Sequence, residues 1–209
     1  MGSKKSTQAI PESVRTSAVF ESNGQFTEDN GQISNNMTKQ DLLPTRHYVI
    51  GIDPDVDKNG VAIVERETKH LECAALTIGD TLDYLQWVAK RAAESGASVK
   101  VYVEAGWMCR TNWHLSKWDN RGQVVAKGVS QGRNEQVSRM LGEMCQHYGL
   151  DWMHIKPLRK CWKGKDRKIT HDELCAVTGL VYGRTNQEMR DAALIAWVEA
   201  GLPVRLWKR

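Results

Sequence analysis

The sequence lacks any long apolar run, and no window approaches the roughly 20 apolar residues that a membrane-spanning helix needs. Near its start, Lys4 and Lys5 are not followed by an apolar stretch, so we expect no secretory signal. The five cysteines are odd in number and form no CxxC pair, and the six histidines do not stand at zinc-ligand spacing from them. This pattern favours reduced thiols over disulfides or a zinc site.

Residues 1–44 also show no sustained hydrophobic period. Ser, Thr, Asn, Gln and Gly are abundant there, and Phe20 and Phe26 are the only aromatic residues. Such a composition predicts a disordered or loosely attached tail. The remaining residues, 45–209, are enough for one domain with a sizeable core.

Periodic segments fill this second part of the chain. Short apolar or alternating runs predict five strands, at residues 48–52, 61–64, 71–77, 99–103 and 152–155. Helical spacing and capping patterns predict helices at 80–95, with Asp80 as the cap, and at 131–148, 170–179 and 186–200. Residues 107–130 show no period and are predicted to form a long connection. The order of these elements predicts an α/β fold, with a mixed five-stranded sheet in which an antiparallel meander joins parallel strands, flanked by helices.

Acidic residues stand where two predicted strands end. Asp53 directly follows the apolar run of the first strand, and Glu104 follows the fourth. A strand that follows a helical crossover lies parallel to an earlier strand, so we expect these two carboxylates to adjoin. Glu188 and Asp191 are three residues apart and share a face in the first turns of the last helix. A helix packed on the sheet could point both at the same place.

Four carboxylates at one point would repel each other, and hard divalent cations relieve that repulsion. All-oxygen ligation suits Mg²⁺ or Mn²⁺. Two such ions, about 3.5–4 Å apart, can activate a water and stabilise the leaving oxygen of a phosphodiester. The acidic set therefore predicts metal-dependent phosphodiester hydrolysis.

The segments that carry these acids, GIDPDVDKNGVAIV, VYVEAGW and EMRDAALIAWV, resemble motifs of the RuvC-type Holliday junction resolvases, which belong to the ribonuclease H-like superfamily. The resemblance covers roughly residues 46–200. It implies a ribonuclease H-like domain with magnesium ligands at Asp53, Glu104, Glu188 and Asp191. It also implies a cytoplasmic, DNA-associated homodimer that cuts four-way junctions or related branched DNA.

Two positions depart from the family pattern. Glu188 stands where the family usually has Asp, or His in some relatives, and Asp55 stands where it usually has Gly. Whether Glu188 ligates metal therefore stays open. Asp55 is either a further ligand or a residue that shapes the turn.

Positive charge is concentrated in one region. The whole chain has a net charge of only +4, whereas residues 105–168 hold 13 Lys and Arg against five Asp and Glu, a net +8. Such a concentration suits binding to phosphates. Four tryptophans interleave with it and could stack on unpaired bases: Trp107, Trp113, Trp118 and Trp162. The candidate DNA contacts, chosen for nearness to predicted strand or helix ends, are Lys127, Arg133, Lys156 and Lys163.

Four of these acids also have an ordinary interpretation, whereas a plain core helix would prefer an uncharged residue at Asp191. Asp53 and Asp55 suit a turn, Glu104 suits a solvated strand end, and Glu188 would complete a capping box with Thr185. For the protein as a whole, the alternatives are a non-catalytic DNA-binding module of the same fold and a nuclease for RNA–DNA hybrids. A sugar-kinase or actin-like ATPase is disfavoured, because those proteins need two such domains and this chain is too short for the pair.

Overall fold

The computed structural model describes residues 46–109, 116–180 and 184–204. The predicted tail, residues 1–44, lies outside these ranges, and so does Trp113. Within them, no helix is long and apolar enough to cross a membrane.

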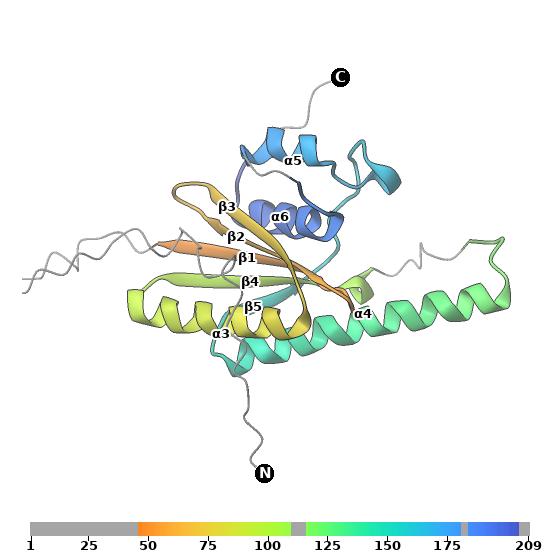
Figure 1. Ribbon diagram of the computed structural model, residues 1–209, viewed down its shortest axis with the longest axis horizontal. Helices are drawn as coiled ribbons and strands as arrows, with labels where there is room; N and C mark the ends of the chain where they lie inside the picture. The colour runs from red at the N-terminus through yellow and green to blue at the C-terminus, as the bar shows by residue number, and fades with distance from the viewer. Residues whose placement is uncertain (1–45, 110–115, 181–183, 205–209) are drawn as a thin grey trace, which may run out of the picture.

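A five-stranded mixed sheet forms the centre of the structure (Figure 1). Its strands lie in the order β3-β2-β1-β4-β5, with β2 antiparallel to both β1 and β3, and with β4 parallel to β1 and β5. This is the sheet order of the ribonuclease H-like fold, so the predicted fold class is confirmed. The strands are β1 (His47–Asp53), β2 (Asn59–Glu65), β3 (His70–Leu76), β4 (Ser98–Glu104) and β5 (Asp151–Ile155).

Four α-helices in the described residues surround this sheet. They are α3 (Ile78–Ser95), α4 (Arg121–His147), α5 (His171–Thr178) and α6 (Gln187–Glu199). Two short 3₁₀ turns, η2 (Gly106–Met108) and η3 (Lys165–Arg167), lie in the connections. The predicted capping box of α5 is present. The Thr170 hydroxyl accepts a hydrogen bond from the Glu173 amide, and the Glu173 carboxylate accepts one from the Thr170 amide.

The start of two helices differs from the prediction. Thr77, not Asp80, caps α3, since its hydroxyl accepts the Asp80 amide at 3.2 Å. The predicted connection 107–130 ends early, because a capping box between Asn120 and Gln123 starts α4 at Arg121. The first turns of α4 are mostly exposed and bury no apolar face, which is why they show no hydrophobic period.

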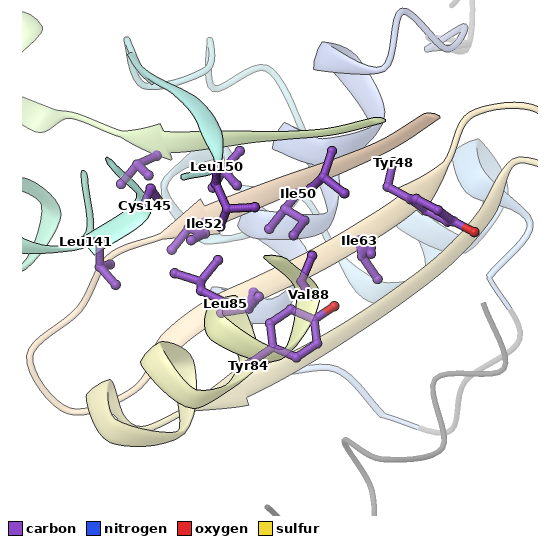
Figure 2. Close-up of a cluster of buried hydrophobic side chains, with 14 of the residues drawn as sticks. Tyr48, Ile50, Ile52, Ile63, Tyr84, Leu85, Val88, Leu141, Cys145 and Leu150 are labelled. Carbon is purple, nitrogen blue, oxygen red and sulfur yellow. The ribbon is translucent and has the colours of Figure 1, made fainter. Parts of the chain in front are cut away.

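The two faces of the sheet carry separate cores, because alternate residues of a strand point to opposite faces. Ile50 and Ile52 belong to the face covered by α3 and α4 (Figure 2), and Val101 belongs to the same cluster. Val49 and the neighbouring strand residues Ala62 and Val64 belong to the other face, where α6 lies on β1 and β2 and α5 packs against α6 (Figure 1). Asp53 and Glu104 continue the alternation on this second face.

Candidate active site

Two parallel strands bring Asp53 and Glu104 together. In the register of β1 and β4, Ile52 pairs with Val103, so the residues that follow, Asp53 and Glu104, lie side by side at the same sheet edge. Both side chains are partly buried. The backbone of Glu104 is fixed from the opposite face, where the buried Ser138 of α4 donates a hydrogen bond to its carbonyl oxygen at 2.7 Å.

Two glycines let α6 lie directly on the sheet above these acids. A Cβ at Gly51 of β1 would stand 2.5 Å from the Ala192 carbonyl oxygen, and a Cβ at Gly60 of β2 would overlap the Glu188 carbonyl. Gly60 pairs with Asp53 in the antiparallel register. The absence of side chains at these positions therefore sets the first turns of α6 close to Asp53.

Asp191 reaches the site from α6 and is held on both carboxylate oxygens. Lys168 Nζ lies 2.7 Å from Oδ2, and Gln187 Nε2 donates to Oδ1 at 2.7 Å. Gln187 is oriented in turn by Arg190, whose guanidinium donates to Gln187 Oε1 at 2.8 Å and to the Ile169 carbonyl at 3.0 Å.

The carboxylates act on each other electrostatically. Burial is the largest of the effects that raise the pKa of Asp53 well above its usual range, followed by the charges of Glu104 and Asp191, while Lys168 opposes them. Burial, followed by the charge of Asp191, raises the pKa of Glu104 to about 7. Negative charge is therefore concentrated at Asp53 and Glu104, and the charge of Lys168 offsets part of it.

Lys168 forms an ion pair with Asp191, and the charges of Lys168 and Lys160 both act on Glu104. Burial acts to lower the pKa of its ammonium, but the hydrogen bond to Asp191 and the charges of all three carboxylates raise that pKa above the ordinary value. Lys168 was not singled out from the sequence, where it is one of several basic residues in 156–168. The fold of the loop selects it, and no local sequence pattern distinguishes it from Lys163 or Lys165.

A pocket opens at this point of the molecule. Asp53, Glu104 and Asp191 line it on one side, and its wall is completed by the apolar Leu158, Ile169, Leu194 and Ile195. Four cations from the loop after β5 also line it, and we call them the basic rim: Arg159, Lys160, Arg167 and Lys168. A pocket lined by both carboxylates and cations suits a phosphodiester with bound metal.

The remaining two acids lie differently. Glu188 is partly buried and does not line the pocket, although its charge adds to the effects that raise the pKa of Asp53. The capping box that was its alternative role is not formed, because Asn186 caps α6 through the Met189 amide. Asp55 accepts the Asp57 amide at 2.9 Å in the turn after β1 and is also absent from the pocket wall.

The four predicted DNA contacts lie outside the pocket wall. Lys127 pairs with Asp119 at 2.7 Å in the first half of α4, and Arg133 is exposed on the same helix. Lys156 is exposed directly after β5, and Lys163 is exposed in the following loop, beside the basic rim. The last two are thus close in sequence to the pocket residues, whereas the partly buried Lys127 and the exposed Arg133 lie on α4.

The described tryptophans divide into packed and exposed ones. Trp107 lies 4.2 Å from the Arg139 guanidinium and makes an edge contact with His154 at 4.8 Å, so it is engaged within the protein. Trp162 lines the pocket and packs against the α6 face. Trp118 is 82% exposed and is therefore accessible for stacking.

The donor set fits a hard cation in its chemistry, since carboxylates from β1, β4 and α6 meet at one pocket. In the arrangement that the described residues adopt, however, no three His, Cys, Asp or Glu side chains are placed to hold a metal ion. The Lys168 ammonium on Asp191 stands where positive charge is required. Asp53, Glu104 and Asp191 are the residues that would hold Mg²⁺ or Mn²⁺.

Comparisons with known proteins find low-level likenesses only. No protein-family model and no curated protein matches the chain. Among solved structures, Thermus thermophilus RuvC is 16% identical and matches 74% of this chain and 96% of its own, with a TM-score of 0.37, and the T. thermophilus RuvC complex with a Holliday junction substrate gives 0.36 at the same identity and coverage. The large terminase nuclease from thermophilic phage G20c is 17% identical over 74% of this chain and 82% of its own, with a TM-score of 0.26. These likenesses are too low to add anything about activity.

Proposed function

We propose that the protein is a metal-dependent endonuclease of the ribonuclease H-like superfamily that cuts branched DNA. The observation that carries this proposal is the meeting of Asp53, Glu104 and Asp191, from three separate elements, in one pocket with a basic rim. When bound there, Mg²⁺ or Mn²⁺ would supply a water activated at neutral pH and a charge that stabilises the leaving oxygen. The carboxylates of Asp53, Glu104 and Asp191 would bind the cation. Glu188 lies outside the pocket wall and adds its negative charge from nearby.

A DNA substrate is supported by the distribution of charge around the pocket. Arg159, Lys160 and Arg167 face it from the loop after β5, and the exposed Lys156 and Lys163 lie in the same loop. Branched DNA, such as a four-way junction, is the substrate that the resemblance of the three acidic motifs to RuvC-type resolvases implies. We therefore also propose an intracellular protein that acts where such DNA forms.

A homodimer is the oligomeric state that the same resemblance implies. The first half of α4 extends beyond the sheet (Figure 1) and exposes Val124, Val125 and Val129. Exposed apolar side chains grouped on one helix suit a contact with another copy. Sedimentation of the full chain tests this part of the proposal, since a monomer at micromolar concentration would contradict it.

Cleavage of a labelled four-way DNA junction tests the proposed activity. The assay compares Mg²⁺ with EDTA and includes a linear duplex and an RNA–DNA hybrid of the same sequence. We expect paired, symmetric cuts in the junction only with Mg²⁺, and a loss of at least about 100-fold for Asp53→Asn, since even partners of metal ligands contribute 10–100-fold. Cleavage of the hybrid alone would support the proposed metal site but would mean that the substrate is an RNA–DNA hybrid and not branched DNA.

A second candidate is a non-catalytic DNA-binding module. The observation that favours it is the Lys168–Asp191 ion pair, which neutralises one of the site's carboxylates, together with the position of Glu188 outside the pocket wall. This candidate requires equal junction binding with and without Mg²⁺ and no cut with any divalent metal. Metal-dependent cleavage would reject it.

A further inference from the structure

A single lysine, Lys168, interacts electrostatically with three carboxylates of the site. The Lys168 ammonium contacts Asp191 Oδ2 at 2.7 Å, and the charges of Asp53 and Glu104 also act on it. Its side chain is only 33% exposed, and it is one of the residues that line the pocket. It therefore supplies, from the protein itself, positive charge that the acidic set requires.

The backbone that presents Lys168 is firmly held. The Trp162 amide donates to the Arg167 carbonyl at 3.1 Å, and the Gly164 amide donates to the Lys168 carbonyl at 3.0 Å. A Cβ at Gly164 would overlap that Lys168 carbonyl, and Asp166 and Arg167 adopt left-handed φ angles of 54° and 59°. The loop therefore fixes the Cα of Lys168, while the side chain beyond it keeps its rotatable bonds.

The two oxygens of Asp191 have different partners. Oδ1 is bonded to Gln187, which Arg190 holds and which therefore has little freedom to move. Oδ2 is bonded to Lys168, the end of a long flexible side chain. Only the Oδ2 partner can leave without disturbing α6 or the backbone of the loop.

We propose that Lys168 is an exchangeable counter-ion. It balances the carboxylates while no metal is bound, and it withdraws from Asp191 Oδ2 when the site is loaded. The proposal rests on the proposed function, because it requires that the site take a divalent cation. It explains why three convergent carboxylates coexist in the described structure without being placed to hold a metal ion.

The proposal predicts opposite effects for two substitutions. Lys168→Met removes the competing charge, so we expect it to strengthen Mn²⁺ binding by at least about ten-fold. Lys168→Arg keeps the charge and adds a planar fork that grips a carboxylate with two bonds, so we expect weaker Mn²⁺ binding than in the wild type. Lys165→Met and Lys165→Arg are matched controls on the same loop, since Lys165 is exposed and does not line the pocket.

The test is calorimetric titration of the full chain with Mn²⁺, with circular dichroism to show that each variant is folded. Tighter binding for Lys168→Met, weaker binding for Lys168→Arg and unchanged binding for the controls would support the proposal. Unchanged or weaker binding by a folded Lys168→Met, beside a wild type that binds, would overturn it and leave the proposed function intact. If Lys168→Met does not fold, Lys168→Arg decides, and binding equal to the wild type overturns the proposal. No Mn²⁺ binding by any form would overturn the proposed metal site and this inference together.

Discussion

The two faces of β1 and β4 differ in what they contain, although the residues alternate along the same strands. On the face covered by α3 and α4, Ile50 and Ile52 are fully buried in an apolar core (Figure 2), and so is Val101. On the face covered by α6, the same strands carry Gly51, then Asp53, and in β4 Glu104. The first face contributes apolar burial alone at these positions, whereas the second combines an apolar core of its own with charge repulsion at the strand ends.

The difference shows how one sheet separates stability from chemistry. Apolar burial on the α3/α4 face stabilises the fold by roughly 25 cal/mol per Å². Stability gained there can offset the burial of the carboxylates and their mutual repulsion, which together raise the pKa of Asp53 and Glu104. Substitutions on one face should therefore change stability alone, and substitutions on the other should change both stability and the site.

The largest expected effect on stability is on the apolar face. Ile50→Ala should lower the free energy of unfolding by about 2–5 kcal/mol, because a fully buried side chain is removed from a packed core. Urea unfolding in EDTA measures this loss. The protein that stays folded should bind Mn²⁺ as the wild type does, and a changed affinity would mean that the two faces are not independent.

Substitution of Gly60, which lies against α6, should affect both stability and junction cleavage. Gly60→Ala places a methyl group against the Glu188 carbonyl, so α6 must move, and we expect a loss of about 1–3 kcal/mol or more. Junction cleavage should fall further than the unfolded fraction explains, because Asp191 moves with the helix. Gly132→Ala in α4 is the control, since nothing lies within 4 Å of its Cβ, and the protein should be unchanged or slightly more stable. Full cleavage by folded Gly60→Ala would show that α6 need not lie so close.

Repulsion in the site should appear as a pH dependence of stability. In the folded protein the pKa of Glu104 is about 7, whereas its ordinary pKa is 4.5. Between these values the folded state binds more protons than the unfolded state, so stability falls as pH rises and the loss is complete above pH 7. We expect about 1–3 kcal/mol between pH 5 and pH 8 in EDTA, with a smaller slope for Glu104→Gln. An identical slope for Glu104→Gln would contradict the stated environment of Glu104, and Glu94→Gln on α3 provides the exposed control.

The smallest expected effects concern single cations at the rim. Arg159→Ala and Arg167→Ala should each reduce the slope of log binding constant against log salt concentration by about 1, the value for one phosphate contact. Lys90→Ala, 76% exposed on α3, should leave it unchanged. Fluorescence anisotropy in EDTA at several salt concentrations measures the slopes. Equal slopes for all three variants would mean that the rim does not contact DNA.

Much of this arrangement was predictable because it depends on strand ends and on order along the chain. The apolar runs, the crossover through α3 and the acids after β1 and β4 predict the mixed sheet and the meeting of Asp53 with Glu104. Asp191 was predictable from its place beside the apolar face of α6. The ligand roles of all four acids stay predictions.

Other features depend on contacts that local sequence does not encode. Lys168 enters the site because a loop closed by Gly164 turns it inward, and the sequence around it is uniformly basic. The early start of α4 was missed because its first turns project from the domain and carry no periodic apolar face. Asn186 rather than Thr185 caps α6, so the expected capping box between Thr185 and Glu188 is not formed.

The free energy of unfolding of Asp53→Asn, measured in urea with EDTA at pH 7.5, tests the central claim most directly. If Asp53 is held against its neighbours to serve a metal site, the neutral amide relieves the repulsion and the variant should be more stable than the wild type by about 1–3 kcal/mol. If Asp53 only shapes the turn after β1, the amide should leave stability unchanged or lower it. A less stable Asp53→Asn would contradict the assignment of this face of the sheet to chemistry.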